Sequence, residues 1–260
     1  MSQPYLSLEA ELHDAFWEAE DDGSEVRLMA EFLKKHPGPA LEIGAGSGRL
    51  MFPLLEMGRE VEGLELSADM RALGAQRADK AGRQAVFHAG DMTDWKAPKR
   101  YAALLVPAFT LQLAEDPAAV LEHWSTWLEP GGGLYLTVFT PLAELNGDLP
   151  ENEWYPDHRA RLPDGRIGSL ETRHRLDEEK GLLHREHRYR IEGGTDSPHE
   201  SRQTIRWMEH PEWMELLETS GFQVLRCYPE FDPGLYEKEN GLEEWSGIMT
   251  YEAVLRAENR

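Results

Sequence analysis

The sequence has little cysteine, little basic charge and no long apolar run. One of its 260 residues is a cysteine, Cys227, which excludes a disulfide within the chain and a cysteine-based metal site. Lysine and arginine number 27 against 48 acidic residues, and the formal net charge is −21. Such a charge repels a phosphate backbone and an anionic membrane, so we expect neither nucleic acid nor membrane as a partner.

Targeting and membrane-spanning signals are also missing. The first residues lack the basic and apolar regions of a signal peptide. The longest nearly apolar stretch, residues 101–114, contains Thr110 and Gln112 and is too short to span a bilayer. With 40% hydrophobic residues the chain can still build a core. We therefore expect a cytoplasmic protein, either a monomer or a homodimer.

Strand-like and helix-like patterns alternate through the first half of the chain. The expected strands are residues 40–43, 60–66, 85–88, 102–106 and 133–139. The expected helices are residues 6–20, 24–36, 48–57, 68–81 and 117–127. Alternation with short links predicts an α/β fold, in which a doubly wound, mostly parallel sheet has helices on both faces.

The pattern changes after residue 140. Residues 141–168 hold several prolines and glycines and little periodicity, which predicts a loop or lid. Three strand-like runs follow at 169–177, 182–191 and 200–208, and they predict an antiparallel β-meander rich in arginine and histidine. A helix at 211–220 and two last strands at 223–228 and 247–255 would close the chain.

A glycine-rich stretch, ALEIGAGSGRL at residues 40–50, lies between the first strand and the next helix. Glycines there let the backbone turn tightly and let a ligand approach the positive end of a helix. The spacing is not the G-x-G-x-x-G of a dinucleotide fold, since Arg49 stands where the third glycine belongs, and no phosphate loop occurs. The stretch therefore predicts a nucleoside-type site, although a tight turn alone would also account for it.

Three acidic residues strengthen this interpretation. Glu65 closes the second expected strand, where a carboxylate can accept hydrogen bonds from both ribose hydroxyls. Asp91 follows the third strand, where a carboxylate can accept from an exocyclic amine of a base. Glu42 precedes the glycines. Ligands of such sheets bind at the carboxyl ends of the strands, and all three acids fall near those ends.

Taken together, these motifs resemble a known family. ExGxGxG from Glu42, the acid that closes strand two, GDM at 90–92 and PGG at 130–132 are similar to class I S-adenosylmethionine-dependent methyltransferases. The resemblance covers about residues 38–140 and, more loosely, 209–255. ELSADM and VPAFTLQLAEDPAAVL favour the small-molecule group, which includes sugar-amine N-methyltransferases and glycine or sarcosine methyltransferases.

The resemblance implies a fold and a division of the chain. The fold would be a seven-stranded, Rossmann-like methyltransferase sheet with a terminal antiparallel strand pair and the inserted meander. Helices within residues 1–37 would cover the cofactor site. Residues 38–140 and 209–260 would form the core that binds S-adenosyl-L-methionine. Residues 141–208 would form an inserted lid and sheet that cover the substrate.

The resemblance also implies roles for individual residues. Glu42 and the backbone of Gly44 would hold the methionine amino end, and Glu65 would bind the ribose. Asp91 would accept from the adenine amine. Further cofactor contacts are implied for Trp17, Gly46, Gly48, Leu66, Met70, Met92, Ala108 and Phe109.

Catalytic candidates are few, because the cofactor is already activated and a base is needed only for a protonated acceptor. After strand four the chain reads VPAFTLQ, without the NPPY-like run of base-methylating enzymes, and Gln112 is the nearest polar group. His13 and Trp17 share one face of the first helix, where His13 could serve as a base. No metal-ligand motif such as H-E-x-x-H occurs, so no metal is expected.

Substrate candidates lie in the predicted insert. Arg188 and Arg206 fall on strand faces where arginines could hold a carboxylate or phosphate. Arginines on a solvent-exposed face that only stabilise the sheet would give the same sequence pattern. Trp154 and Tyr155 form an aromatic pair in the predicted lid. The favoured function is methyl transfer to a nitrogen, oxygen or sulfur atom of a small molecule. A methyltransferase acting on tRNA or protein, or a cofactor-binding module without activity, stays open, and an NAD enzyme is disfavoured by the glycine spacing.

Overall fold

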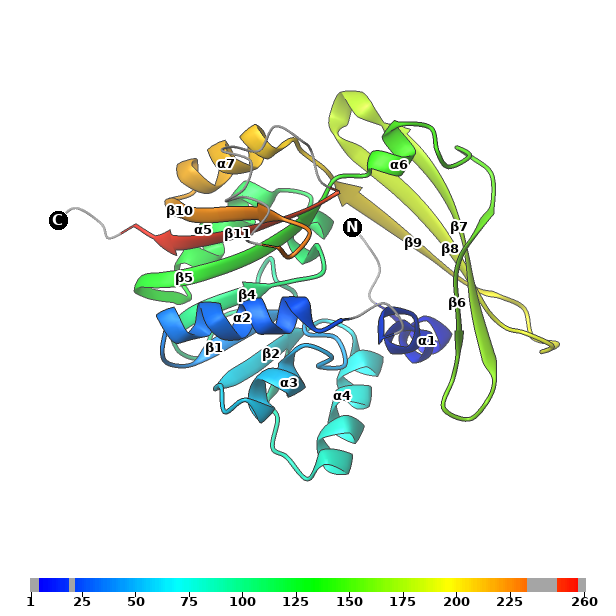
Figure 1. The fold of residues 1–260 in the computed structure, drawn as a ribbon, viewed down its shortest axis with the longest axis horizontal. Coiled ribbons are helices and arrows are strands. Elements are labelled where there is room, and N and C mark those ends of the chain that lie inside the picture. Colours follow the sequence, from blue (N-terminus) through cyan, green and yellow to red (C-terminus); the bar gives the residue numbers. More distant parts are fainter. Residues whose placement is uncertain (1–4, 19–21, 233–246, 257–260) are drawn as a thin grey trace.

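The computed structural model describes residues 5–18, 22–232 and 247–256. These ranges form two β-sheets, the larger of which has helices on both faces (Figure 1). The larger sheet contains β1 (Ala40–Ile43), β2 (Val61–Glu65), β3 (Phe87–Ala89), β4 (Tyr101–Val106), β5 (Leu128–Phe139), β10 (Phe222–Pro229) and β11 (Ile248–Leu255). The α-helices are α1 (Ser7–Glu18), α2 (Ser24–Lys35), α3 (Met51–Glu56), α4 (Ala68–Ala81), α5 (Pro117–Ser125), α6 (Leu142–Leu145) and α7 (His210–Thr219).

The larger sheet has the strand order β10-β11-β5-β4-β1-β2-β3. Strands β1 to β5 pair in parallel, whereas β11 pairs antiparallel with both β5 and β10. The chain starts at the centre with β1, moves outward to β3, and returns through β4 to the other edge. This arrangement confirms the predicted fold class, a doubly wound sheet of seven strands with a terminal antiparallel pair.

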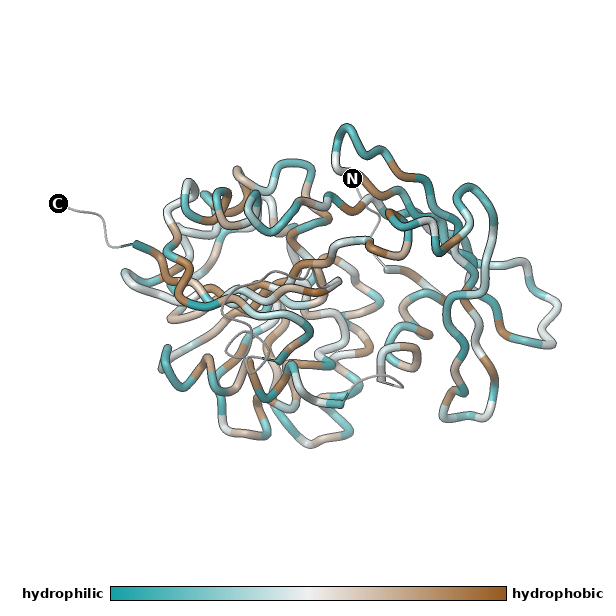
Figure 2. The backbone as a smooth tube through the Cα atoms, turned by 45° about the horizontal axis from the view of Figure 1, so that its top comes forward, coloured by the Kyte–Doolittle hydropathy of each residue, from teal (hydrophilic) through white to brown (hydrophobic). Residues whose placement is uncertain are grey.

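Two apolar layers hold the helices against this sheet. On one face, buried residues of α2, α3 and α4 pack against side chains such as Ala103 and Leu105 of β4. On the other face, Trp124 of α5 and Trp213 of α7 pack against the alternate β4 residues. Hydrophobic residues accordingly follow the strands of this sheet in Figure 2. Because both faces of the central strands are buried, successive residues are apolar, and these strands read as continuous apolar runs in the sequence.

The second sheet has four antiparallel strands in the order β6-β7-β8-β9. They are β6 (Tyr155–Arg161), β7 (Ile167–Asp177), β8 (Leu182–Ile191) and β9 (His199–Arg206). The predicted meander is confirmed, but the prediction of a loop throughout 141–168 is wrong, because β6 lies inside it. Strand β6 is at an edge, where Pro156 is tolerated, and its pairing with β7 shifts register next to that proline. The proline thus hid a strand from the sequence pattern.

Helix α1 lies between the two sheets (Figure 1). Its residues Leu12 and Phe16 form a small apolar cluster with Leu170 and Tyr189 of the second sheet. Gly168 of β7 makes this close approach possible, since a Cβ there would come within 2.4 Å of the Leu12 side chain. Helix α2, by contrast, packs on the larger sheet. The first helix therefore joins the insert to the core.

Candidate active site

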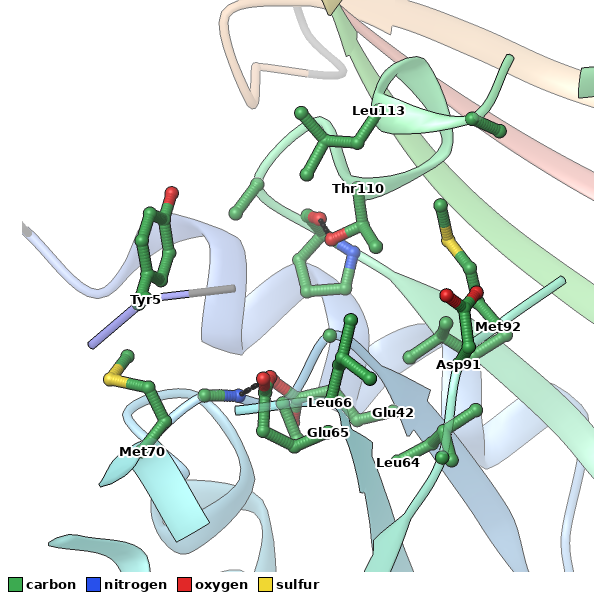
Figure 3. A pocket seen from close by; sticks show the side chains of 18 of the residues that line it. Tyr5, Glu42, Leu64, Glu65, Leu66, Met70, Asp91, Met92, Thr110 and Leu113 are labelled. Atoms are coloured by element: carbon green, nitrogen blue, oxygen red, sulfur yellow. Dashed lines mark hydrogen bonds between the residues drawn. The ribbon is translucent and has the colours of Figure 1, made fainter. Parts of the chain in front are cut away.

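A cavity of about 450 Å³ opens at the carboxyl ends of β1, β2 and β4 (Figure 3). Ten of the predicted cofactor residues line it: Trp17, Glu42, Gly44, Gly46, Glu65, Leu66, Met70, Asp91, Met92 and Ala108. Leu66 is half exposed at its rim, whereas Met70 is fully buried. The structure therefore brings together residues that are far apart in the sequence at the edge where ligands of such sheets bind.

The glycine loop combines left-handed backbone with close packing. Gly44 and Gly46 have φ values of 72° and 56°, and a Cβ on Gly44 would lie 2.6 Å from Oγ1 of Thr110. Gly48 is also left-handed, but it does not line the cavity. A Cβ there would meet the ring of Phe52 at 2.7 Å. The predicted role of Gly48 as cofactor space is thus corrected: its missing side chain makes room for the first helix after the loop.

Glu65 ties the loop to the next helix. Its Oε2 accepts a hydrogen bond from the Gly46 N–H at 2.9 Å, and its Oε1 accepts from the Ser67 N–H at 2.6 Å. The first of these bonds is drawn in Figure 3. Each carboxylate oxygen can accept more than one hydrogen bond, so the group is fixed in place and still able to bind a ligand. Ser67 in turn caps α4 by accepting from the Met70 N–H.

Glu42 is a buried acid without a hydrogen-bond partner for its Oε2 among the described residues. It is 2% exposed and lines the cavity. Burial raises the pKa of this carboxyl to about 8, although the charge of Arg49 opposes the shift. A buried polar atom of this kind is costly unless a ligand satisfies it. The site is therefore suited to a group that donates hydrogen bonds and carries positive charge.

Asp91 lies in the turn after β3. Its Oδ1 accepts from both the backbone N–H and the hydroxyl of Thr93, at 2.9 and 2.7 Å. These bonds orient the carboxylate and leave Oδ2 for another donor. Figure 3 shows Asp91 on the opposite side of the cavity from Met70. The cavity is therefore lined by carboxylates from three segments, those of Glu42, Glu65 and Asp91.

A second cavity, of about 660 Å³, adjoins the first and is lined mainly by α1, β6, β8 and β9. The two cavities share the side chains of Tyr5, His13, Trp17, Ala108, Leu113 and Gln203. Phe109, predicted at the cofactor site, lines only the second cavity. Two separate ligands could thus meet at a common wall.

The second cavity contains more acid than base. Glu9 is 4% exposed, and its Oε1 accepts hydrogen bonds from the hydroxyls of Tyr189 and Ser201, each at 2.9 Å. Asp157 accepts from Thr172, whose hydroxyl also contacts Nδ1 of His187 at 2.9 Å.

The basic groups of this cavity are largely neutralised. Burial, with a contribution from Arg185, lowers the pKa of His187 to about 4, so this imidazole is neutral at pH 7. Arg185 pairs with the buried Glu144. The cavity therefore presents acceptors and negative charge to whatever enters it.

The predicted substrate residues are only partly brought to this cavity. Tyr155 lines it, but Trp154, Arg188 and Arg206 do not. Arg188 stacks 3.7 Å from the Trp154 ring centroid and pairs with Glu200. Arg206 donates to the carbonyl of Lys180. The predicted arginine face is the outer face of the sheet, and this part of the prediction is corrected, because the register of β8 turns Arg185 inward instead.

Gln112 is likewise removed from the candidates. Its Nε2 donates to the carbonyls of Phe139 and Arg206, and its Oε1 accepts from the Phe139 N–H. The side chain is 1% exposed and lines neither cavity. It joins β5 to the end of β9, so its amide has a structural role. His13, the other candidate, lines both cavities.

Several site residues were missed from the sequence, chiefly Tyr5, Glu9, Arg185 and Gln203. The signal for Arg185 was present, since it alternates with His187 and Tyr189 on one strand face. Which face turns inward depends on α1, a contact that no local pattern encodes. Within the described residues, no three histidine, cysteine or acidic side chains are placed to share a metal ion. In that same part of the chain, no helix has both the length and the apolar character needed to cross a membrane.

Comparison with known proteins fits this geometry. Residues 40–132 match the family described as a methyltransferase domain. The dTDP-3-amino-3,6-dideoxy-alpha-D-glucopyranose N,N-dimethyltransferase of Streptomyces fradiae is 30% identical over 131 residues, which is 47% of this chain and 50% of that protein. The chain spans about half the length of the curated relatives it matches.

Solved structures extend the likeness over the whole fold. An S-adenosylmethionine-dependent methyltransferase from Clostridium acetobutylicum has a TM-score of 0.75 at 13% identity, covering 95% of this chain and 97% of that one. The sugar N-methyltransferase KedS8 from a Streptoalloteichus species has a TM-score of 0.70 at 18% identity, covering 98% and 97%. The chain thus resembles a methyltransferase domain over residues 40–132 and shares the fold of solved methyltransferases. Its expected resemblance to class I S-adenosylmethionine-dependent methyltransferases is confirmed.

Proposed function

We propose that this chain is an S-adenosylmethionine-dependent methyltransferase that acts on a small molecule. The first cavity would hold the cofactor and the second the methyl acceptor. The observation that carries this proposal is the wall that the two cavities share, because a methyl donor and its acceptor must meet in a fixed geometry. The methyltransferase domain at residues 40–132 supports it.

The residues of the first cavity fit the cofactor. Glu42, buried and without a partner for one oxygen among the described residues, suits the ammonium of the methionine end. Glu65 suits the ribose hydroxyls and Asp91 the adenine amine. The other cofactor contacts that we propose are Trp17, Gly44, Gly46, Leu66, Met70, Met92 and Ala108, with Phe109 bordering the acceptor side.

The cofactor would supply a methyl group already activated by a sulfonium. The chain's task is then to position the acceptor and to exclude water. Positioning alone can supply about 7–11 kcal/mol of the barrier. Tyr5, Trp17 and Leu113 form much of the common wall, and their aromatic and apolar surfaces are suited to keeping water out.

We infer that the acceptor atom is a nitrogen. Glu9 and Asp157 place two carboxyl groups in the second cavity, where they can bind an ammonium group. Burial raises the pKa of Glu9, whereas at Asp157 burial is outweighed by hydrogen bonds from His158 and Thr172, which lower the pKa of that carboxyl. The formal net charge of −21 acts in the same direction and disfavours tRNA as a substrate. The names of an N,N-dimethyltransferase and a sugar N-methyltransferase among the similar proteins agree with this choice. A cytoplasmic location, and a monomer or homodimer, remain our expectations for the protein.

Calorimetry with S-adenosylmethionine and its demethylated product tests the cofactor assignment. Both should bind the folded protein, and absence of binding by either one would refute the proposal. Asp91→Ala should weaken binding by about 1–3 kcal/mol, because a hydrogen-bond acceptor is lost. Asp94→Ala, in the same turn but exposed, is the matched control and should change nothing.

A screen of small amines, hydroxy compounds, acids and thiols tests the reaction. Release of the demethylated cofactor should require an amine. Turnover with a thiol or hydroxyl alone would overturn the nitrogen assignment. Cofactor binding without turnover on any acceptor would favour a binding module without transferase activity.

A further inference from the structure

The wall shared by the two cavities contains one side chain suited to proton transfer near neutral pH. Among the described residues that line both cavities, Tyr5 and His13 are the titratable ones. Burial, with a contribution from Glu9, raises the pKa of Tyr5 to about 12, so it holds its proton at pH 7. Histidine is the residue type that gains and loses a proton in this range. His13 is therefore the group at the wall that can act as a base.

Asp14 fixes one nitrogen of this imidazole. Its Oδ1 lies 3.1 Å from Nδ1 of His13. Its Oδ2 accepts from the hydroxyl of Ser47 at 2.6 Å and from Nη2 of Arg77 at 2.8 Å. Burial acts to raise the pKa of Asp14, but the hydrogen bonds from His13 and Ser47, with the charges of His13 and Arg77, lower it to about 2. The carboxylate is thus ionised and held on both oxygens.

We propose that His13 is the general base of the transfer reaction and that Asp14 is the residue that positions it. The ionised Asp14 accepts the Nδ1 proton, so the lone pair of neutral His13 is on Nε2. This inference rests on the proposed function, because it needs an acceptor that arrives with a proton to lose. It applies to an amine acceptor, which is an ammonium ion near pH 7.

The step is a proton transfer. One N–H bond of the acceptor ammonium breaks and its electron pair stays on nitrogen. The proton forms a bond to Nε2 of His13, and the resulting imidazolium is stabilised by the Asp14 carboxylate. The neutral amine then has the lone pair that methyl transfer requires.

The position of Asp14 also links the base to the glycine loop. Ser47, which donates to Asp14, lies between Gly46 and Gly48. Arg77, the other donor, is on α4, which begins after Glu65 and Ser67. The elements that form the cofactor cavity therefore also set the orientation of the imidazole.

Other ionisable groups line the two cavities with His13, or contact Asp14, Glu9 or His13 itself. They are Tyr5, Glu9 and Asp14 on its own segment, Glu65 on β2, Arg77 on α4, Asp157 and His158 on β6, Arg185 and His187 on β8, and His199 on β9 beside Glu9. Because several charged groups share these cavities, the effect of Asp14 must be measured as a difference between variants.

Nitrogen NMR of the full chain labelled at histidine tests the positioning without any acceptor. His13→Gln assigns the signal, and spectra are recorded with and without the demethylated cofactor. We expect neutral His13 to carry its proton on Nδ1, and Asp14→Asn to remove this tautomer preference. Asp79→Asn, an exposed change on α4, should leave the tautomer unchanged. A proton on Nε2 in the wild-type protein, or an unchanged tautomer in Asp14→Asn, would overturn the proposal.

Kinetics with an amine found by the screen tests the base. His13→Gln should lower kcat by about 10²- to 10⁴-fold and remove the rise of kcat with pH. Asp14→Asn should lower kcat with a small change in KM. If the wild-type protein binds the cofactor and turns over while His13→Gln leaves the pH profile of kcat unchanged, the base assignment fails and the proposed function stands. If the wild-type protein binds no cofactor, the proposed function itself fails.

Discussion

The two cavities are built by different means. The first is lined by a glycine loop and by residues that directly follow parallel strands. The second is lined by side chains from α1, from the second sheet and from the ends of β5 and β11. The methyltransferase family match, at residues 40–132, covers most of the first and little of the second. A nucleoside-type site can therefore be specified by short local motifs, whereas an acceptor site depends on which strand face turns inward.

Among the following variants, the largest expected effect is a loss of cofactor affinity at the first cavity. Glu65→Ala removes hydrogen bonds to two backbone N–H groups and the proposed ribose partner. Hydrogen bonds to a charged group contribute about 1.5–3 kcal/mol each, so cofactor affinity should fall about 100-fold or more. Calorimetry gives the change. Glu60→Ala, an exposed acid before the same strand, serves as the control, and equal losses in the two variants would contradict the assignment.

The pH dependence of cofactor binding tests Glu42. Its pKa of about 8 means that the free carboxyl holds a proton at lower pH. An ammonium partner favours the carboxylate, so binding must release that proton. Affinity should rise by up to about tenfold per pH unit below pH 8 and level off above it. Calorimetry in buffers of different ionisation enthalpy counts the protons, and a pH-independent affinity between pH 6 and 8 would count against this role.

A smaller effect should be confined to the second cavity. Glu9→Gln keeps a group that can accept hydrogen bonds from Tyr189 and Ser201 but removes its charge. If the Glu9 carboxylate contributes about 1.4 kcal/mol to binding of the acceptor ammonium, its loss raises KM for an amine acceptor about tenfold. Cofactor affinity should stay the same. Steady-state kinetics and calorimetry separate the two cavities, and a change in cofactor affinity alone would show that they are not independent.

The smallest effect is expected outside both cavities. Arg188→Ala removes an outer-face ion pair with Glu200 and a stacking contact with Trp154. Exposed pairs of this kind contribute about 0–1 kcal/mol to stability. Both kcat and KM should therefore stay close to their wild-type values, while the melting temperature falls slightly. A marked rise in KM would instead indicate that the acceptor binds at the outer face of the second sheet and not in the second cavity.

These differences explain what the sequence could predict. The order of strands and helices in the larger sheet follows from apolar periodicity and from the short links between elements. The placement of Glu42, Glu65 and Asp91 follows because each comes at or after a parallel strand. These features depend on neighbouring residues, so they can be predicted without knowledge of contacts between distant segments.

The features that the sequence did not predict depend on contacts between distant segments. Strand β6 was hidden by Pro156, and its pairing with β7 is what makes it a strand. Gly48 looked like part of a ligand loop, but its neighbour is Phe52. Arg185 and Arg188 differ by three positions and so lie on opposite faces. Only the packing of α1 decides which of these two arginines meets the cavity.

The contact of α1 with the second sheet has a consequence for synthesis of the chain. Leu12 and Phe16 leave the ribosome early, but Leu170 and Tyr189, which cover them, are made more than a hundred residues later. At about 5–20 residues per second, this interval is on the order of ten seconds or more. During that time the apolar side of the first helix has no partner from the second sheet. The growing chain must then keep this helix from aggregating until the sheet that covers it has been made.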